Sequence, residues 1–219
     1  MRTEDLRPVY VSVLVVYPLL NKFRGTELSD FFAVVRKTHL YESFQQKGDD
    51  GAVLETESER TLELDRGSMH MEEYPRTGMD LVKKNVVDLT SDVKKHFGLY
   101  AMRCMRVRIE AVWPIPDDLR PAVSTMRRQV LTVEDDQYQM LGETEDVGIR
   151  LIGHRDNGNF GFNIEISSDP EEEGQLNLRL ETHSHDDVGT PAVIGEFVDK
   201  SWEFLHNNVA HFVNTLFTE

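Results

Sequence analysis

Apolar and polar positions alternate along several short segments of the chain, and this period of two predicts β-strands. The segments with this pattern are residues 8–20, 40–44, 52–59, 60–64, 69–74, 101–113, 148–154, 160–167 and 176–182. Turn-forming residues separate many of them. Asp156-Asn157-Gly158-Asn159 is the clearest such turn, because asparagine and glycine tolerate positive φ, and it predicts a hairpin between 148–154 and 160–167.

Apolar residues recur every three or four positions in four other segments, which predicts helices. These segments are residues 26–38, 79–97, 119–131 and 191–216. The last is the most strongly patterned, and Pro191 suits its first turn. A stripe this broad is expected to pack on a sheet, because a large exposed apolar patch would promote association.

The order of these elements predicts an α+β protein with a long C-terminal helix. Each half reads as strand, helix, two or three strands and helix, so we expect two related halves, 1–113 and 114–219, joined at Pro114-Ile115-Pro116. Their strands suit antiparallel sheets with the helices on one face. One continuous domain and two packed units both fit the pattern.

Residues 101–113 form the clearest long strand. Simple alternation places Arg103, Met105 and the apolar positions through Trp113 on one face, and Cys104, Arg106, Arg108 and Glu110 on the other. Arg106 and Arg108 then either line a concave sheet surface that meets an anionic ligand, or form salt bridges with Glu63 or Glu110.

Charge narrows the possible partners. The 219 residues include 39 acidic and 24 basic side chains, a formal net charge of -15. Such a protein repels phosphate backbones, so direct nucleic-acid binding is not expected. The acidic runs 55–59, 143–146 and 169–173 are either solvated loops or one acidic surface for a basic partner.

The first apolar run, residues 9–20, is too short to span a bilayer and lacks a signal-peptide cleavage site. The single Cys104 permits no internal disulfide and suits a small buried side chain. We therefore expect a soluble protein of the prokaryotic cytoplasm with no membrane association. The sequence leaves its oligomeric state open.

Two groups of residues are candidates for chemistry. His183 and His185 share one face of a strand and, with Asp186 and more distant His154, offer ligands for zinc or a similar divalent metal; a plain exposed strand end is the alternative. Trp113, Trp202 and Arg103 are the candidate ligand-binding residues of an apolar pocket. Apart from the divalent metal, no cofactor is predicted. Serine-hydrolase and P-loop motifs are absent from the sequence.

The element order resembles a sporadically distributed, uncharacterised bacterial α+β protein family. The matching features are Tyr74-Pro75 before the second helix, the strand at residues 105–110, and the ending at residues 212–218. This resemblance implies a fold and no catalytic residues.

We therefore expect a non-enzymatic interaction or regulatory protein that meets a protein partner within a larger assembly. A small-ligand-binding protein and a metal-dependent hydrolase that uses His183 and His185 are the two alternatives.

Overall fold

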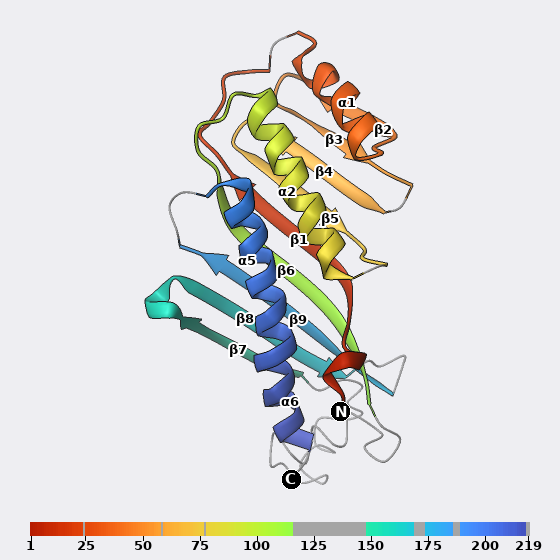
Figure 1. Cartoon of the computed structure of the whole chain (residues 1–219), viewed down its shortest axis with the longest axis vertical. Helices are drawn as coiled ribbons and strands as arrows, with labels where there is room; N and C mark the ends of the chain where they lie inside the picture. The colour runs from red at the N-terminus through yellow and green to blue at the C-terminus, as the bar shows by residue number, and fades with distance from the viewer. Residues whose placement is uncertain are drawn as a thin grey trace, which may run out of the picture.

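A computed structural model describes residues 1–23, 25–57, 59–76, 78–115, 148–168, 174–185 and 189–217 (Figure 1). In these residues nine strands form one antiparallel sheet, in the order β2-β3-β4-β5-β1-β6-β9-β8-β7. The strands are β1 (Arg7–Val16), β2 (Ser43–Lys47), β3 (Gly51–Glu55), β4 (Arg60–Asp65), β5 (Ser68–Glu73), β6 (Arg103–Pro114), β7 (Gly148–Arg155), β8 (Phe160–Ser168) and β9 (Gln175–Ser184). The helices are α1 (Glu27–Thr38), α2 (Met79–His96), α5 (Pro191–Glu203) and α6 (Ala210–Phe217), with short turns η1 (Thr3–Asp5) and η4 (Asp156–Gly158) and a π-helical segment η5 (Phe204–Val209).

The sheet runs through both expected halves of the chain. Strand β1 lies between β5 and β6, and β6 pairs on its other edge with β9. The two-half organisation itself stays a prediction, but the strands from both sides of Pro114 belong to one hydrogen-bonded ladder.

One face of the sheet, here called the apolar face, forms the core. Alternate residues of the central strands are buried on it, including Val11, Val13, Ile109, Leu178 and Leu180. Each long helix reaches this face through side chains. Rings stack 5.0 Å apart between Phe32 of α1 and Phe44 of β2, and Phe197 of α5 lies 5.7 Å from Phe160 of β8. From α2, Asn85 donates to the carboxylate of Glu73 on β5. In the view of Figure 1, α1, α2 and α5 lie in front of the strands.

Helices α2 and α5 pack against each other over the middle of the sheet (Figure 1). Gly195 sits where the helices approach, and a methyl group there would overlap Val87. Lys83 of α2 forms an ion pair with Asp199 of α5 beside this contact. Helix α2, which precedes β6, and helix α5 are therefore in close contact.

The C-terminal helix begins with a side-chain cap. Thr190 accepts a 3.3 Å hydrogen bond from the backbone N–H of Val193, and Pro191 occupies the first turn, where its missing N–H costs nothing. The helix continues through the π-helical segment η5 into α6. None of the helices in the described ranges is both long and apolar enough to cross a bilayer.

The α+β class, the large antiparallel sheet and the long C-terminal helix are confirmed. The predicted strand at 40–44 is displaced, since β2 begins at Ser43 and Leu40 adopts a left-handed conformation with φ of 60°. The predicted helix at 119–131 and the acidic runs 143–146 and 169–173 lie outside the described residues.

The predicted assignment of side chains to the two faces of β6 is wrong at the start of the strand. The register between β1 and β6 shifts by one residue, because Leu14 pairs with Arg106 and Val15 with Cys104, which leaves Met105 as a β-bulge. Cys104 is consequently buried, 5% exposed, on the same face as Val107, while Met105 is 42% exposed. Strict alternation cannot foresee one extra residue in a strand.

Candidate functional site

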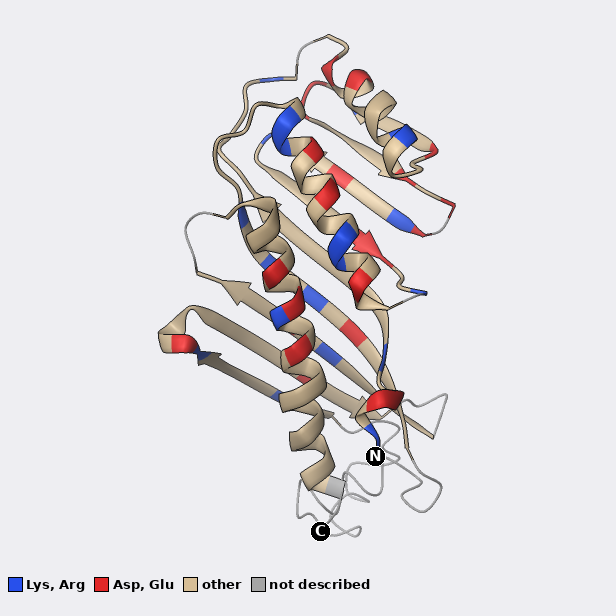
Figure 2. Ribbon diagram, in the orientation of Figure 1, with Lys and Arg blue, Asp and Glu red and all other residues tan. Residues whose placement is uncertain are grey.

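The opposite face of the sheet, here called the polar face, carries charged and polar side chains. Cross-strand registers align them in rows from β4 to β7. Its residues are Tyr10, Ser12, Leu14, Glu63, His70, Glu72, Arg106, Arg108, Glu110, Arg150, Ile152, His154, Asn163, Glu165, Arg179, Glu181 and His183. Figure 2 shows bands of both signs side by side on the central strands.

Ion pairs connect neighbouring strands across this face. Arg179 of β9 and Arg150 of β7 lie 3.3 and 3.7 Å from the carboxylate of Glu165 on β8. Arg106 of β6 lies 3.9 Å from Glu181 of β9. Opposite charges on adjacent strands favour this register over its slipped alternatives.

Arg108 sits at the centre of the polar face. It forms an ion pair with Glu110, one of the two carboxylates that the sequence offered as partners, and its guanidinium lies 5.4 Å from the centre of the Tyr10 ring. The Tyr10 hydroxyl donates a 2.7 Å hydrogen bond to Glu72. Burial and this hydrogen bond raise the pKa of Tyr10 to about 12, so the hydroxyl keeps its proton.

Three nitrogen atoms near this centre are shielded from solvent but have no hydrogen-bond partner within the described residues. They are Nε2 of His70, Nε of Arg106 and Nε of Arg108. Shielded polar groups are nearly always paired in folded proteins, and an unpaired donor carries a desolvation cost.

A hollow of about 470 Å³ lies at the end of the polar face where β6, β9, β8 and β7 meet. We call it the histidine hollow. Its lining combines cationic, polar and apolar side chains: Arg103, Met105, Arg150, Ile152, His154, Phe162, Asn163, Glu181, His183, Ser184 and His185, with Gly153 and Gly161.

The structure brings the predicted histidines together here. The rings of His154 and His185 are centred 6.5 Å apart on either side of Gly161, and His183 Nε2 lies 3.1 Å from Glu181 Oε1. Asp186 lies outside the described residues. Within the described ranges, there is no group of three or more His, Cys, Asp or Glu side chains that could hold a metal ion. The zinc site therefore stays a prediction.

The three predicted ligand-binding residues lie in different environments. Trp113 is fully buried, and its indole N–H donates a 2.8 Å hydrogen bond to the carbonyl oxygen of Arg2. Trp202 of α5 is half-buried, with its ring 5.6 Å from that of His206. Arg103 alone of the three lines the histidine hollow. Neither tryptophan lines the histidine hollow, and the ligand-binding role of the three residues stays a prediction.

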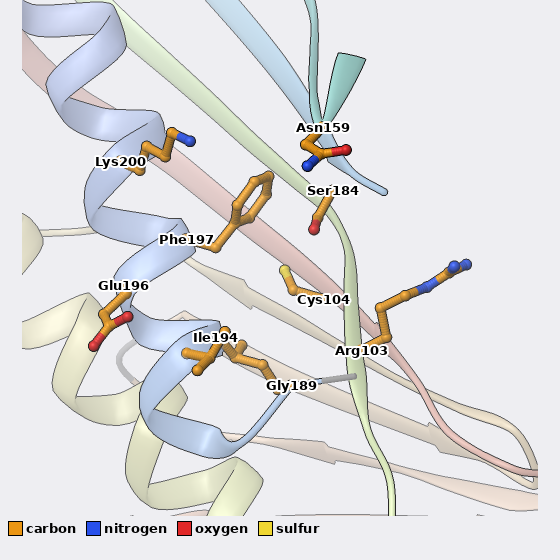
Figure 3. A pocket seen from close by; sticks show the side chains of 10 residues that line it. Arg103, Cys104, Asn159, Ser184, Gly189, Ile194, Glu196, Phe197 and Lys200 are labelled. Atoms are coloured by element: carbon orange, nitrogen blue, oxygen red, sulfur yellow. The ribbon is translucent and has the colours of Figure 1, made fainter. Parts of the chain in front are cut away.

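A smaller cavity of about 160 Å³ lies on the apolar face between α5 and the strands β6 and β9. Figure 3 shows Ile194 and Phe197 projecting from α5 toward Cys104 on β6, with Arg103 and Ser184 at the side that borders the histidine hollow. Cys104 is the free thiol of the chain. Burial raises its pKa to about 12.

Cys104 is therefore expected to be inert in the folded protein. The thiolate is the reactive form of cysteine, and a pKa near 12 leaves almost none of it at neutral pH. Iodoacetamide labelling followed by intact mass spectrometry should show negligible modification of the native protein and complete modification in denaturant. Rapid labelling without denaturant would contradict this assignment.

Sequence reasoning missed Arg150, Met105 and Ile152 as members of one site. A faint signal existed, since Ile152 is an apolar residue between the polar positions 150 and 154 of its strand. The scan against protein-family models and the search of curated proteins found no match to this chain. The family resemblance thus stays a prediction, and function has to be inferred from the geometry.

Proposed function

We propose that this chain is a non-enzymatic interaction protein that packs its helices on the apolar face of the sheet and docks a protein partner on the polar face. The observation that carries the proposal is the pair of arginines at the centre of the polar face, Arg106 and Arg108, whose side chains remain 35% and 30% exposed. Carbonyl or carboxylate oxygens of a partner would accept hydrogen bonds from these guanidinium groups.

The size of the polar face suits a protein rather than a small molecule. The polar face spans seven strands, β4 to β7 in sheet order, which cover roughly 34 Å at the usual spacing, and strands of about nine residues run for roughly 29 Å. The resulting face is on the order of 1,000 Å², whereas a standard interface covers about 800 Å² of each partner.

The side chains of the polar face also resemble those of interfaces. Its central positive charges come from arginines, Arg106 and Arg108, and Tyr10 stands beside them. Arginine and tyrosine are enriched at interface centres, although the neighbouring Glu72, Glu110 and Glu181 belong to a residue type that is depleted there. Because both signs of charge are interleaved here, the partner is expected to present a mixed surface with acidic groups opposite the two arginines.

Replacing both central arginines with alanine is expected to abolish partner recovery. The tagged protein and the R106A/R108A variant would be purified from native cells after crosslinking, and recovered proteins quantified by mass spectrometry. Losing two charge-assisted contacts at an interface centre typically costs at least about 2 kcal/mol, or roughly thirtyfold in affinity. The matched control is R36A/K37A, which removes two exposed cations from α1.

A partner retained by R106A/R108A and lost by R36A/K37A would overturn the polar face as the docking surface. Thermal unfolding of both variants must show an intact fold, because the arginine stems also cover part of the sheet.

A small-ligand-binding role is the second candidate, and the histidine hollow favours it. Its volume lies within the range of ordinary ligand pockets. We also propose that the protein resides in the cytoplasm and belongs to the bacterial family that its element order resembles.

A further inference from the structure

We propose that the histidine hollow binds a small organic anion, a carboxylate attached to an apolar body. This inference rests on the second candidate function, ligand binding at the same hollow, and names the chemical class of the ligand. The hollow offers cationic donors and apolar walls side by side, which is the combination that such a ligand requires.

Charge sets the hollow apart from the rest of the molecule. The chain has a formal net charge of -15, yet the described lining contains the two guanidinium groups of Arg103 and Arg150 against one carboxylate, Glu181, with Glu165 outside the lining and 3.7 Å from Arg150. The guanidinium of Arg150 is held in place, since its Nε donates a 3.1 Å hydrogen bond to Asn163 Oδ1. A positioned guanidinium binds a carboxylate with little further loss of side-chain freedom.

The imidazoles extend this donor set. His154 and His185 flank Gly161, whose hypothetical Cβ atom would lie 3.5 Å from His154 Nδ1 and 3.6 Å from His185 Nε2. The missing side chain of Gly161 leaves the floor between the two rings open. An imidazole retains at least one N–H donor in either protonation state, so both rings can donate to an anion near neutral pH.

Apolar side chains supply the other wall. Ile152 is 69% exposed and Met105 is 42% exposed, although most residues of the polar face are charged or polar. The β-bulge at Met105 interrupts the alternation of β6, and Met105 lines the hollow. Two exposed apolar side chains that line one cationic hollow indicate an amphipathic ligand rather than an inorganic ion.

The test uses three probes with the full chain. Benzoate has both the carboxylate and the apolar ring, benzamide keeps the ring without the charge, and acetate keeps the charge without the ring. Each would be titrated into ¹⁵N-labelled protein and followed by amide chemical shifts. Benzoate is expected to shift the amides of Gly161, His154 and His183 saturably, and the other two to bind at least about tenfold more weakly.

Two arginine variants form a matched pair. Arg150 and Arg179 both contact Glu165, but Arg150 lines the hollow and Arg179 is not part of its lining. R150Q is expected to weaken benzoate binding at least about tenfold, and R179Q to leave it unchanged. In a third variant, G161A, the added methyl fits at ordinary contact distances yet occupies the floor between the imidazoles, so it should also reduce binding.

Equal affinity for benzoate and benzamide, no saturable shift near Gly161, or equal effects of R150Q and R179Q would each overturn the proposal. These measurements use purified protein and free ligand, so they can fail while the polar face still docks a protein, and the reverse also holds.

Discussion

Truncation of Trp113 to alanine is expected to lower the free energy of unfolding by about 3–5 kcal/mol, the usual loss for a large aromatic side chain in a core. Trp113 is fully buried at the end of β6, and it is among the largest of the side chains buried to this degree. Its indole N–H also holds the N-terminal segment through the carbonyl oxygen of Arg2. Urea unfolding followed by far-UV circular dichroism measures the change without relying on tryptophan fluorescence.

Trp202→Ala is the matched control, because Trp202 is half-buried on α5 and leaves a smaller cavity. We expect it to cost clearly less than Trp113→Ala. A loss below about 1 kcal/mol for Trp113→Ala would contradict its assignment to the core.

Gly195→Ala is expected to destabilise the protein by about 1–3 kcal/mol, the usual cost of an overpacked contact. In an unobstructed helix the same change stabilises, because alanine is the better helix former. Here the new methyl would overlap Val87 of α2, so α2 and α5 would have to separate. Urea unfolding gives both the sign and the size of the effect.

The double variant V87A/G195A tests the cause of that loss. Shortening Val87 makes room for the new methyl, so the double variant should be more stable than the sum of the two single changes implies. Strict additivity would show that the loss arises elsewhere than at the α2–α5 contact.

Local patterns predicted the local elements well. Helix α2 and the C-terminal helix were predicted because their apolar stripes run for several turns, and the β7–β8 hairpin because Asn157 and Gly158 form a turn with positive φ. The strand order was not predictable in this way, since β1 pairs with β6 across most of the N-terminal half. Pairing at such distances depends on tertiary packing that a single sequence does not encode locally.

The candidate site was likewise predictable only where its residues lie close together in the sequence. His183 and His185 were predicted to share a face because they are two apart on a strand. Their companions Arg150 and Met105 come from other strands, and only the sheet order and the β-bulge bring them to one hollow. Trp113 lies in the core of the sheet, and its predicted ligand role stays a prediction.

The central position of β6 has a consequence for the newly synthesised chain. One edge of β6 pairs with β1, which is made before it, and the other with β9, which leaves the ribosome much later. Until β9 arrives, that edge is bare, and bare edges invite pairing with other chains. Arg106 and Arg108 stand along it, and charged side chains on an open edge discourage such pairing. Arg106 and Arg108 are thus expected to protect the edge of β6 from pairing with other chains until β9 has been synthesised.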